Sequence, residues 1–113
     1  RQSKEIVSDN IILNNEEFNV RLRKHACSNE HRLIVRYKTK SINKMFMRIQ
    51  DPFRIRIFFS YDVKVKEFTI ENNCTLIRKW DRHGNEIWIL RQYINGQEKE
   101  QYYIQSRIRS NSY

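Results

Sequence analysis

Hydrophobic and polar residues alternate along much of the chain with a period of two rather than 3.6. In "FRIRIFFSY", Arg54, Arg56 and Phe58 fall on the side opposite to most of the large apolar residues. Successive side chains of a β-strand point to opposite faces, so this pattern predicts a half-buried strand over residues 53–61. Three more segments have the same period and are also predicted to be strands: residues 18–24, 31–39 and 44–50.

The C-terminal third contains the dipeptide Asn95-Gly96, which suits the two positive φ angles of a type I′ hairpin turn. A two-residue turn at this point fixes the register of the strands on either side. The predicted cross-strand pairs, from the turn outward, are Ile94 with Gln97, Tyr93 with Glu98, Gln92 with Lys99, Arg91 with Glu100, Ile89 with Tyr102, Trp88 with Tyr103 and Ile87 with Ile104. Arg91 and Glu100 then form a favourable pair of opposite charges near the turn.

The segment "WDRHGNEIW" predicts another turn, in which Gly84 or Asn85 adopts the left-handed conformation. A loop of about two or four residues would put Leu76 and Trp80 on the face of the isoleucines in the next strand. A loop of about three residues would turn the strand over. We expect the even-numbered loop, because it keeps Trp80 over the isoleucines.

The pattern predicts a mainly β protein with little helix, since no segment keeps an apolar stripe of helical spacing. We expect an antiparallel β-sandwich or small open barrel of about seven or eight strands. A C-terminal β-meander would run from about Cys74 to Ile108. The 113 residues form one predicted domain, residues 1–113, long enough to bury a core. Because the first residue is Arg1, we expect a segment of a longer chain.

Positive charge is concentrated in the middle of the chain. The segment from Arg21 to Lys66 holds thirteen lysines and arginines against three acidic residues, whereas the whole chain carries a net charge of +9. One explanation is an anionic partner, drawn by the summed field and by counterion release. The alternative is that charged outer strand positions only keep the sheet soluble and discourage edge-to-edge pairing.

No catalytic, metal or cofactor signature is present. Cys27 lies between His25 and His31, but residues two apart on a strand do not form a catalytic pair, and the paired spacing of a zinc site is missing. Two glycines cannot build a phosphate-binding loop. We therefore expect no enzyme, no cofactor and no metal. Reduced thiols are the favoured state of Cys27 and Cys74, with a disulfide as the alternative.

No apolar run approaches the ~20 residues that a membrane helix requires, so we expect no membrane insertion and an intracellular location. The predicted function is that of a binding or assembly module whose basic face engages an acidic protein or peptide segment. The residues assigned to this face are Arg36, Lys38, Lys40, Arg54, Arg56 and Phe58.

Two alternatives stay open. The same face could bind single-stranded RNA or DNA, with Phe46, Phe58 or Tyr61 stacking on bases. Large aromatic residues are more often core than stacking platforms, which weighs against this interpretation. The other alternative is self-association through an edge strand, which the long C-terminal hairpin could supply.

The piece "YKTKSINKMFMRIQDPF", residues 37–53, resembles part of the major sperm protein domain. The residues that carry the resemblance are Lys38, Thr39, Met45, Phe46, Ile49 and Pro52. The resemblance implies an immunoglobulin-like β-sandwich that assembles with itself or binds short peptides, with Lys38 and Lys40 as candidate binding residues. The glycine and second proline that follow in the family are absent here.

Overall fold

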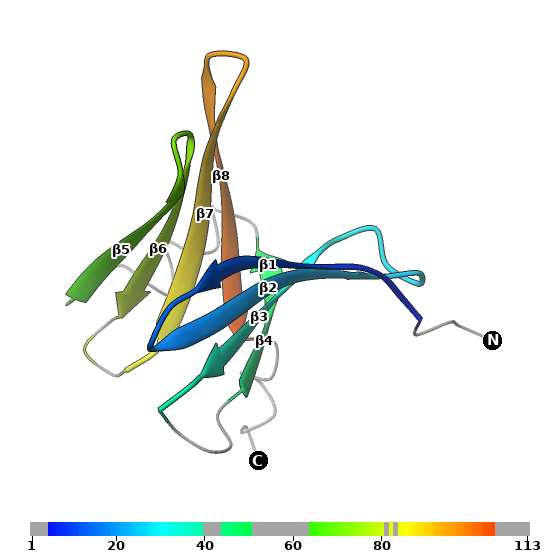
Figure 1. The fold of residues 1–113 in the computed structure, drawn as a ribbon, viewed down its shortest axis with the longest axis horizontal. Helices are drawn as coiled ribbons and strands as arrows, with labels where there is room; N and C mark the ends of the chain where they lie inside the picture. Colours follow the sequence, from blue (N-terminus) through cyan, green and yellow to red (C-terminus); the bar gives the residue numbers. More distant parts are fainter. Residues whose placement is uncertain (1–4, 40–43, 51–63, 81, 83, 106–113) are drawn as a thin grey trace. The chain divides into compact units, whose positions relative to one another are not determined.

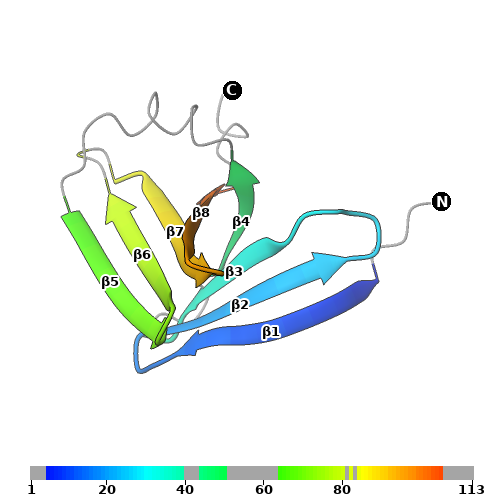
Figure 2. The ribbon, with the colours of Figure 1, turned by 90° about the horizontal axis from the view of Figure 1, so that it is seen from above.

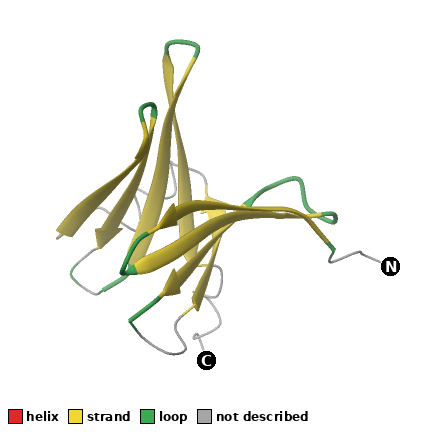
Figure 3. Cartoon of the chain, viewed as in Figure 1, coloured by secondary structure: helices red, strands yellow, loops and turns green. Residues whose placement is uncertain are grey.

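The computed structural model describes residues 5–39, 44–50, 64–80, 82 and 84–105. These residues form strands, turns and short connections, and none of them is helical (Figure 3). The predicted fold class is therefore confirmed: the chain is mainly β, and its described residues form eight antiparallel strands and no helix. The described part of the chain contains no helix of the length and apolarity that crossing a bilayer would take.

The chain divides into two compact units, each built around an antiparallel meander (Figure 1). The N-terminal unit contains β1 (Ile6–Asn14), β2 (Phe18–His25), β3 (Arg32–Tyr37) and β4 (Lys44–Gln50). Each strand pairs with the next one along the chain. Figure 2 shows β1, β2 and β3 side by side.

The core of the N-terminal unit lies on one face of this meander. Val20 of β2 is directly opposite Val35 of β3, and both are fully buried. Phe18 is also buried and meets the ring of Tyr37 edge-on, with centroids 5.1 Å apart. The predicted alternation of β2 and β3 is thus confirmed, and the residues between these core positions must point to the other face.

A side-chain-capped turn joins β1 to β2. The Asn15 side-chain oxygen accepts hydrogen bonds from the backbone N–H groups of Glu17 and Phe18, both at 2.8 Å. Asparagine favours such turns because its side chain imitates a backbone carbonyl. The turn sets Phe18 at the start of β2 and thereby fixes which residues of β2 face the core.

The C-terminal unit is a second meander of four strands. It contains β5 (Lys64–Glu71), β6 (Cys74–Trp80), β7 (Glu86–Ile94) and β8 (Gln97–Gln105). From Ile87 to Leu90, four consecutive residues of β7 are buried. Consecutive residues point to opposite faces, so both faces of β7 are covered, which explains its unbroken apolar run.

The β7–β8 hairpin has the predicted register throughout, from Ile94 opposite Gln97 to Ile87 opposite Ile104. Both turn residues have positive φ, 54° at Asn95 and 79° at Gly96, as a type I′ turn requires. The predicted pair also forms, since Arg91 Nε donates to Glu100 Oε2 at 2.8 Å.

The prediction for the β6–β7 connection was wrong. Leu76 lies opposite Leu90 and Trp80 opposite Glu86, so these two residues of β6 are not on the face of Ile87 and Ile89. The connection has an odd number of residues, and β6 is turned over relative to the expected arrangement. The physical reason is Arg78, which shares its face with Trp80 and Trp88 and is buried there.

The predicted strand over residues 53–61 lies outside the described residues. Strand β1, which the alternation did not predict, is the first of the N-terminal meander.

Candidate anion-binding face

The face of the N-terminal unit opposite its core carries rows of arginines aligned across the strands. One row crosses four strands, because Asp9 pairs with Arg23, Arg23 with Arg32, and Arg32 with Arg48. Neighbouring strands lie about 4.8 Å apart, so residues paired in this way are direct neighbours. We call the following set the arginine face: Arg21, Arg23, Arg32, Arg36 and Arg48, together with Asp9, Asn19 and Ile34.

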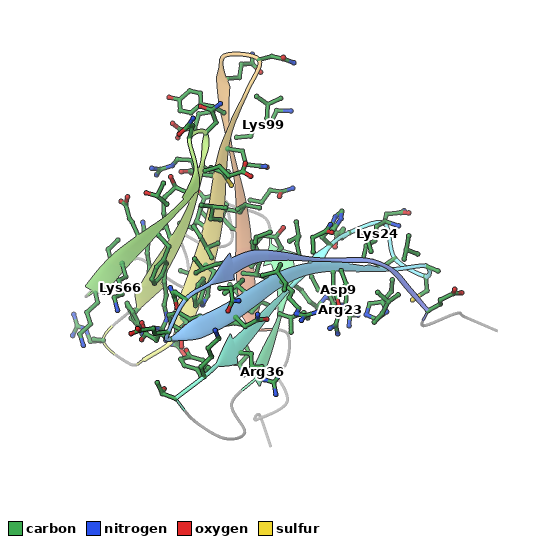
Figure 4. The ribbon with its side chains drawn as sticks, viewed as in Figure 1. Asp9, Arg23, Lys24, Arg36, Lys66 and Lys99 are labelled. Carbon is green, nitrogen blue, oxygen red and sulfur yellow. The ribbon has the colours of Figure 1, made fainter. Side chains whose placement is uncertain are left out.

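Asp9 holds two of these arginines. Its Oδ2 accepts from Arg21 Nη1 at 3.3 Å and from Arg23 Nη2 at 3.2 Å. Figure 4 shows Asp9 and Arg23 together and Lys24 on the other side of β2. Arg21 is fixed a second time, because its Nε donates to Asn19 Oδ1 at 3.1 Å. The two guanidinium groups therefore have defined positions before any ligand arrives.

The pairing at Asp9 is incomplete. Asp9 Oδ1 and Arg23 Nε are both buried, and neither has a hydrogen-bond partner in the described structure. A buried donor without a partner costs free energy that an added acceptor can recover. Arg23 Nε is therefore an unsatisfied donor that lies beneath the surface of the arginine face.

Arg32, Arg36 and Arg48 have no hydrogen bond or ion pair with any residue that the structure describes. Arg32 lies between two other arginines in its row, Arg23 and Arg48. Like charges directly opposite each other destabilise a sheet. Among the described positions of the three rows that make up this face, Asp9 is the only acid.

A pocket of about 220 Å³ opens within this face. Its wall combines guanidinium groups, one amide and one apolar side chain, from Asn19, Arg21, Arg23, Ile34 and Arg36. Ile34 is only 2% exposed, although it shares the face with arginines. Long arginine stems can cover such a side chain while the charged ends stay in water. The pocket therefore presents mainly polar and charged groups, with Ile34 covered beneath them.

The structure locates two of the six predicted binding residues. Arg36 is exposed and lines the pocket. Lys38 is exposed just after β3, where its Nζ donates to Asn14 Oδ1. The other four lie outside the described residues: Lys40, Arg54, Arg56 and Phe58.

Four arginines of the face were counted in the charge-rich segment but not assigned to a site: Arg21, Arg23, Arg32 and Arg48. The signal that identifies them is the pairing of β2 with β3 and of β3 with β4, which aligns them in rows.

The C-terminal unit places a buried arginine in a different setting. Arg78 Nε donates to Glu86 Oε1 at 2.8 Å, and the indole N–H of Trp88 donates to the same oxygen at 3.0 Å. The Arg78 guanidinium also lies over two indole rings, 4.1 Å from the centroid of Trp80 and 5.4 Å from that of Trp88. The charge is neutralised within the unit, so this cluster is structural rather than a binding surface.

The β7–β8 hairpin pairs its charges as well. The pKa of Glu100 is lowered, mainly because the Tyr102 hydroxyl donates to it at 2.6 Å and further because Arg91 does so at 2.8 Å. The pKa of Arg91 is raised, chiefly by the same hydrogen bond to Glu100. Both partners are therefore held in their charged forms at neutral pH.

Both cysteines are free thiols in the structure. Cys27 is exposed, whereas Cys74 is partly buried and its pKa is raised by that burial and by the nearby Glu71 carboxylate. Within the described part of the chain, no three side chains of the histidine, cysteine, aspartate and glutamate types gather as metal ligands would.

Comparisons with known proteins give no relative: no family model, no curated protein and no solved structure matches this chain. The resemblance of residues 37–53 to the major sperm protein domain therefore stays a prediction.

Proposed function

We propose that this chain is a non-enzymatic binding module whose arginine face engages an acidic segment of a partner protein. The observation that carries the proposal is the row formed by Arg23, Arg32 and Arg48, three adjacent arginines of which, among the described residues, only Arg23 has a carboxylate partner. Such a row costs free energy in the unbound protein and is relieved by an anion. The planar guanidinium fork matches the two oxygens of a carboxylate.

The spacing of the face supports an extended partner. Alternate residues of a strand repeat every ~6.7 Å, and neighbouring strands are ~4.8 Å apart. The arginines thus form a grid in which side chains of an extended acidic chain can reach successive rows. Arg36, which is exposed and has no partner among the described residues, supplies hydrogen bonds to such a chain.

Nucleic acid is the second candidate because arginines also bind phosphates. Single-stranded nucleic acids are held by aromatic stacking as well as by charge. The register sets Phe46 of β4 opposite Ile34 of the arginine face, so a single-stranded RNA must be tested beside the acidic segment. Self-association through an edge strand stays a prediction, and concentration-dependent sedimentation tests it.

The test is a titration of the isotope-labelled protein with polyglutamate at physiological ionic strength, followed by NMR. We expect shift changes at the arginine face. The double variant Arg36→Glu/Arg48→Glu should weaken binding at least about tenfold, or 1.4 kcal/mol. Both side chains are exposed and unpaired in the described structure, so the fold should survive. Lys99→Glu, a charge reversal at an exposed residue of β8, serves as the matched control.

Three results would contradict the proposal. Polyglutamate could shift signals over the whole surface, the double variant could bind as well as the parent protein, or Lys99→Glu could weaken binding equally. A mixed-sequence single-stranded RNA should be titrated alongside. Tighter RNA binding, persisting at physiological salt, would favour the nucleic-acid candidate instead.

A further inference from the structure

The pocket in the arginine face differs from the rest of that face because three arginines and one asparagine line a single cavity of about 220 Å³. It is lined by Asn19, Arg21, Arg23, Ile34 and Arg36, all from β2 and β3. We infer that this pocket is a phosphate subsite that takes a phosphorylated side chain of the acidic partner segment. This inference rests on the proposed function and narrows the chemistry of the partner.

The charge of the pocket matches a dianion. Three arginines line it, and Asp9, which bonds to two of them, neutralises one charge. Two positive charges remain. A phosphate monoester carries about −1.5 to −2 at pH 7, whereas a carboxylate or a phosphodiester carries one negative charge. A monoester therefore balances the pocket, and the single charge of a nucleic-acid phosphate does not.

The donors of the pocket suit phosphate as well. The Asn19 side-chain oxygen accepts from Arg21, which leaves the amide N–H groups of Asn19 for another acceptor. Arg23 contributes its positive charge, whereas its Nε is buried beneath the surface. Arg36 has no partner among the described residues. Arg36 and Asn19 therefore offer charge-assisted and amide donors, and a phosphate offers three strong acceptor oxygens.

The arrangement is also preorganised. Asp9 fixes Arg21 and Arg23 at 3.3 and 3.2 Å, so two of the three cations lose little freedom when a ligand binds. Ile34 also lines the pocket but is only 2% exposed, so it offers a ligand little contact area. Only Arg36, which is exposed, has to be ordered by the ligand.

Three small probes test the inference: capped phosphoserine, capped glutamate and dimethyl phosphate. Each is titrated into the whole chain and followed through the side-chain Nε–H signals of the arginines. We expect phosphoserine to bind at least about tenfold more tightly than either singly charged probe. Arg36→Gln should reduce phosphoserine affinity at least about fivefold.

Two control variants remove the same charge elsewhere: Arg48→Gln, on the arginine face but not among the pocket residues, and Lys99→Gln on β8. Each of these variants should bind phosphoserine with an affinity within about twofold of that of the parent protein.

Equal affinities for phosphoserine and glutamate, or an unchanged affinity in Arg36→Gln, would overturn the phosphate inference. If polyglutamate still bound to the arginine face, the proposed function would stand without it. If dimethyl phosphate bound as tightly as phosphoserine, the pocket would be a site for diesters. If the parent protein bound neither phosphoserine nor polyglutamate, both the inference and the proposed function would be wrong.

Discussion

The two units use arginine in opposite ways. In the N-terminal unit, Arg32, Arg36 and Arg48 share a sheet face and have no partner among the described residues. In the C-terminal unit, Arg78 is held by Glu86 at 2.8 Å and Arg91 by Glu100 at 2.8 Å. Both units are antiparallel meanders, so the difference arises from which residues the register sets beside each arginine.

The comparison indicates that net charge alone is a poor guide to a binding surface. An arginine that is neutralised within its own unit contributes to stability and offers little to a ligand. An arginine set among other arginines offers charge to a ligand and costs stability in its absence. We therefore expect the removal of charge to change the stability of the two units in opposite directions.

The largest effect is expected in the C-terminal unit, from Glu86→Gln. The substitution keeps the shape of the side chain but leaves the charge of Arg78, which is 7% exposed, without its carboxylate. Breaking a buried ion pair by removing one partner costs about 3–5 kcal/mol, and we expect a loss near the lower end, about 3 kcal/mol. Urea unfolding followed by the fluorescence of Trp80 and Trp88 measures it.

The control for this prediction is Arg78→Met combined with Glu86→Gln. The double variant removes both charges of this buried pair, so most of the lost free energy of unfolding should return. A loss below about 1 kcal/mol in Glu86→Gln would mean that other groups neutralise Arg78, and the contrast between the units would weaken.

The strands of this fold were predictable where alternation persists. Residues 18–24, 31–39 and 44–50 correspond to β2, β3 and β4, and the Asn95-Gly96 turn specified the register of the last hairpin. Strand β1 was missed because its pairing with β2 shifts twice, between Ile6 and Ser8 and between Ile11 and Leu13. Each irregularity interrupts the period of two that identifies a strand.

The site was predictable only in part. The sequence located the charge-rich segment and assigned Arg36 and Lys38 to a binding face. It could not align Arg23 with Arg32, because the connection between β2 and β3 contains no turn dipeptide that fixes the register. The orientation of β6 was predicted wrongly for a similar reason, since the hydropathy pattern does not show that Arg78 stacks on two indole rings.

The next largest effect is expected from Asp9→Asn in the N-terminal unit. Arg21 and Arg23 lose their shared carboxylate, but they are 37% and 16% exposed, so water compensates for part of the loss. We expect a loss of about 1 kcal/mol, measured by amide hydrogen exchange of β2. Added salt should restore part of it by screening the repulsion between the arginines. A loss as large as that of Glu86→Gln would contradict the comparison.

A smaller, pH-dependent effect is expected from the β7–β8 hairpin. The pKa of Glu100 is lowered in the folded state, from an ordinary value of 4.5, by the Tyr102 hydroxyl and Arg91. The ionised form is thus stabilised by folding, so this contribution is present above pH 4.5 and is lost as the pH falls through the lowered pKa. Glu100→Gln should flatten this part of the stability profile, with an amplitude of roughly 0.5 kcal/mol because Arg91 is partly exposed. An unchanged acid limb in the variant would contradict the assignment to Glu100.

The smallest expected effect is a gain in stability rather than a loss, and it tests the difference between the two units most directly. Arg32 lies between Arg23 and Arg48, and each like-charged neighbour costs a few tenths of a kcal/mol. Arg32→Gln should therefore raise the free energy of unfolding by about 0.5 kcal/mol at low salt, with little gain at high salt. The same variant should weaken polyglutamate binding several-fold.

Stability gained together with binding lost distinguishes a surface shaped for an anion from charges that only keep a sheet soluble. For a purely solubilising arginine, removal would leave the binding of polyglutamate unchanged. Lys99→Gln is the matched comparison, because Lys99 lies opposite the uncharged Gln92 and should change neither quantity. If Arg32→Gln destabilised the unbound protein, Arg32 would be making favourable contacts of its own, and the N-terminal unit would use its arginines as the C-terminal unit does.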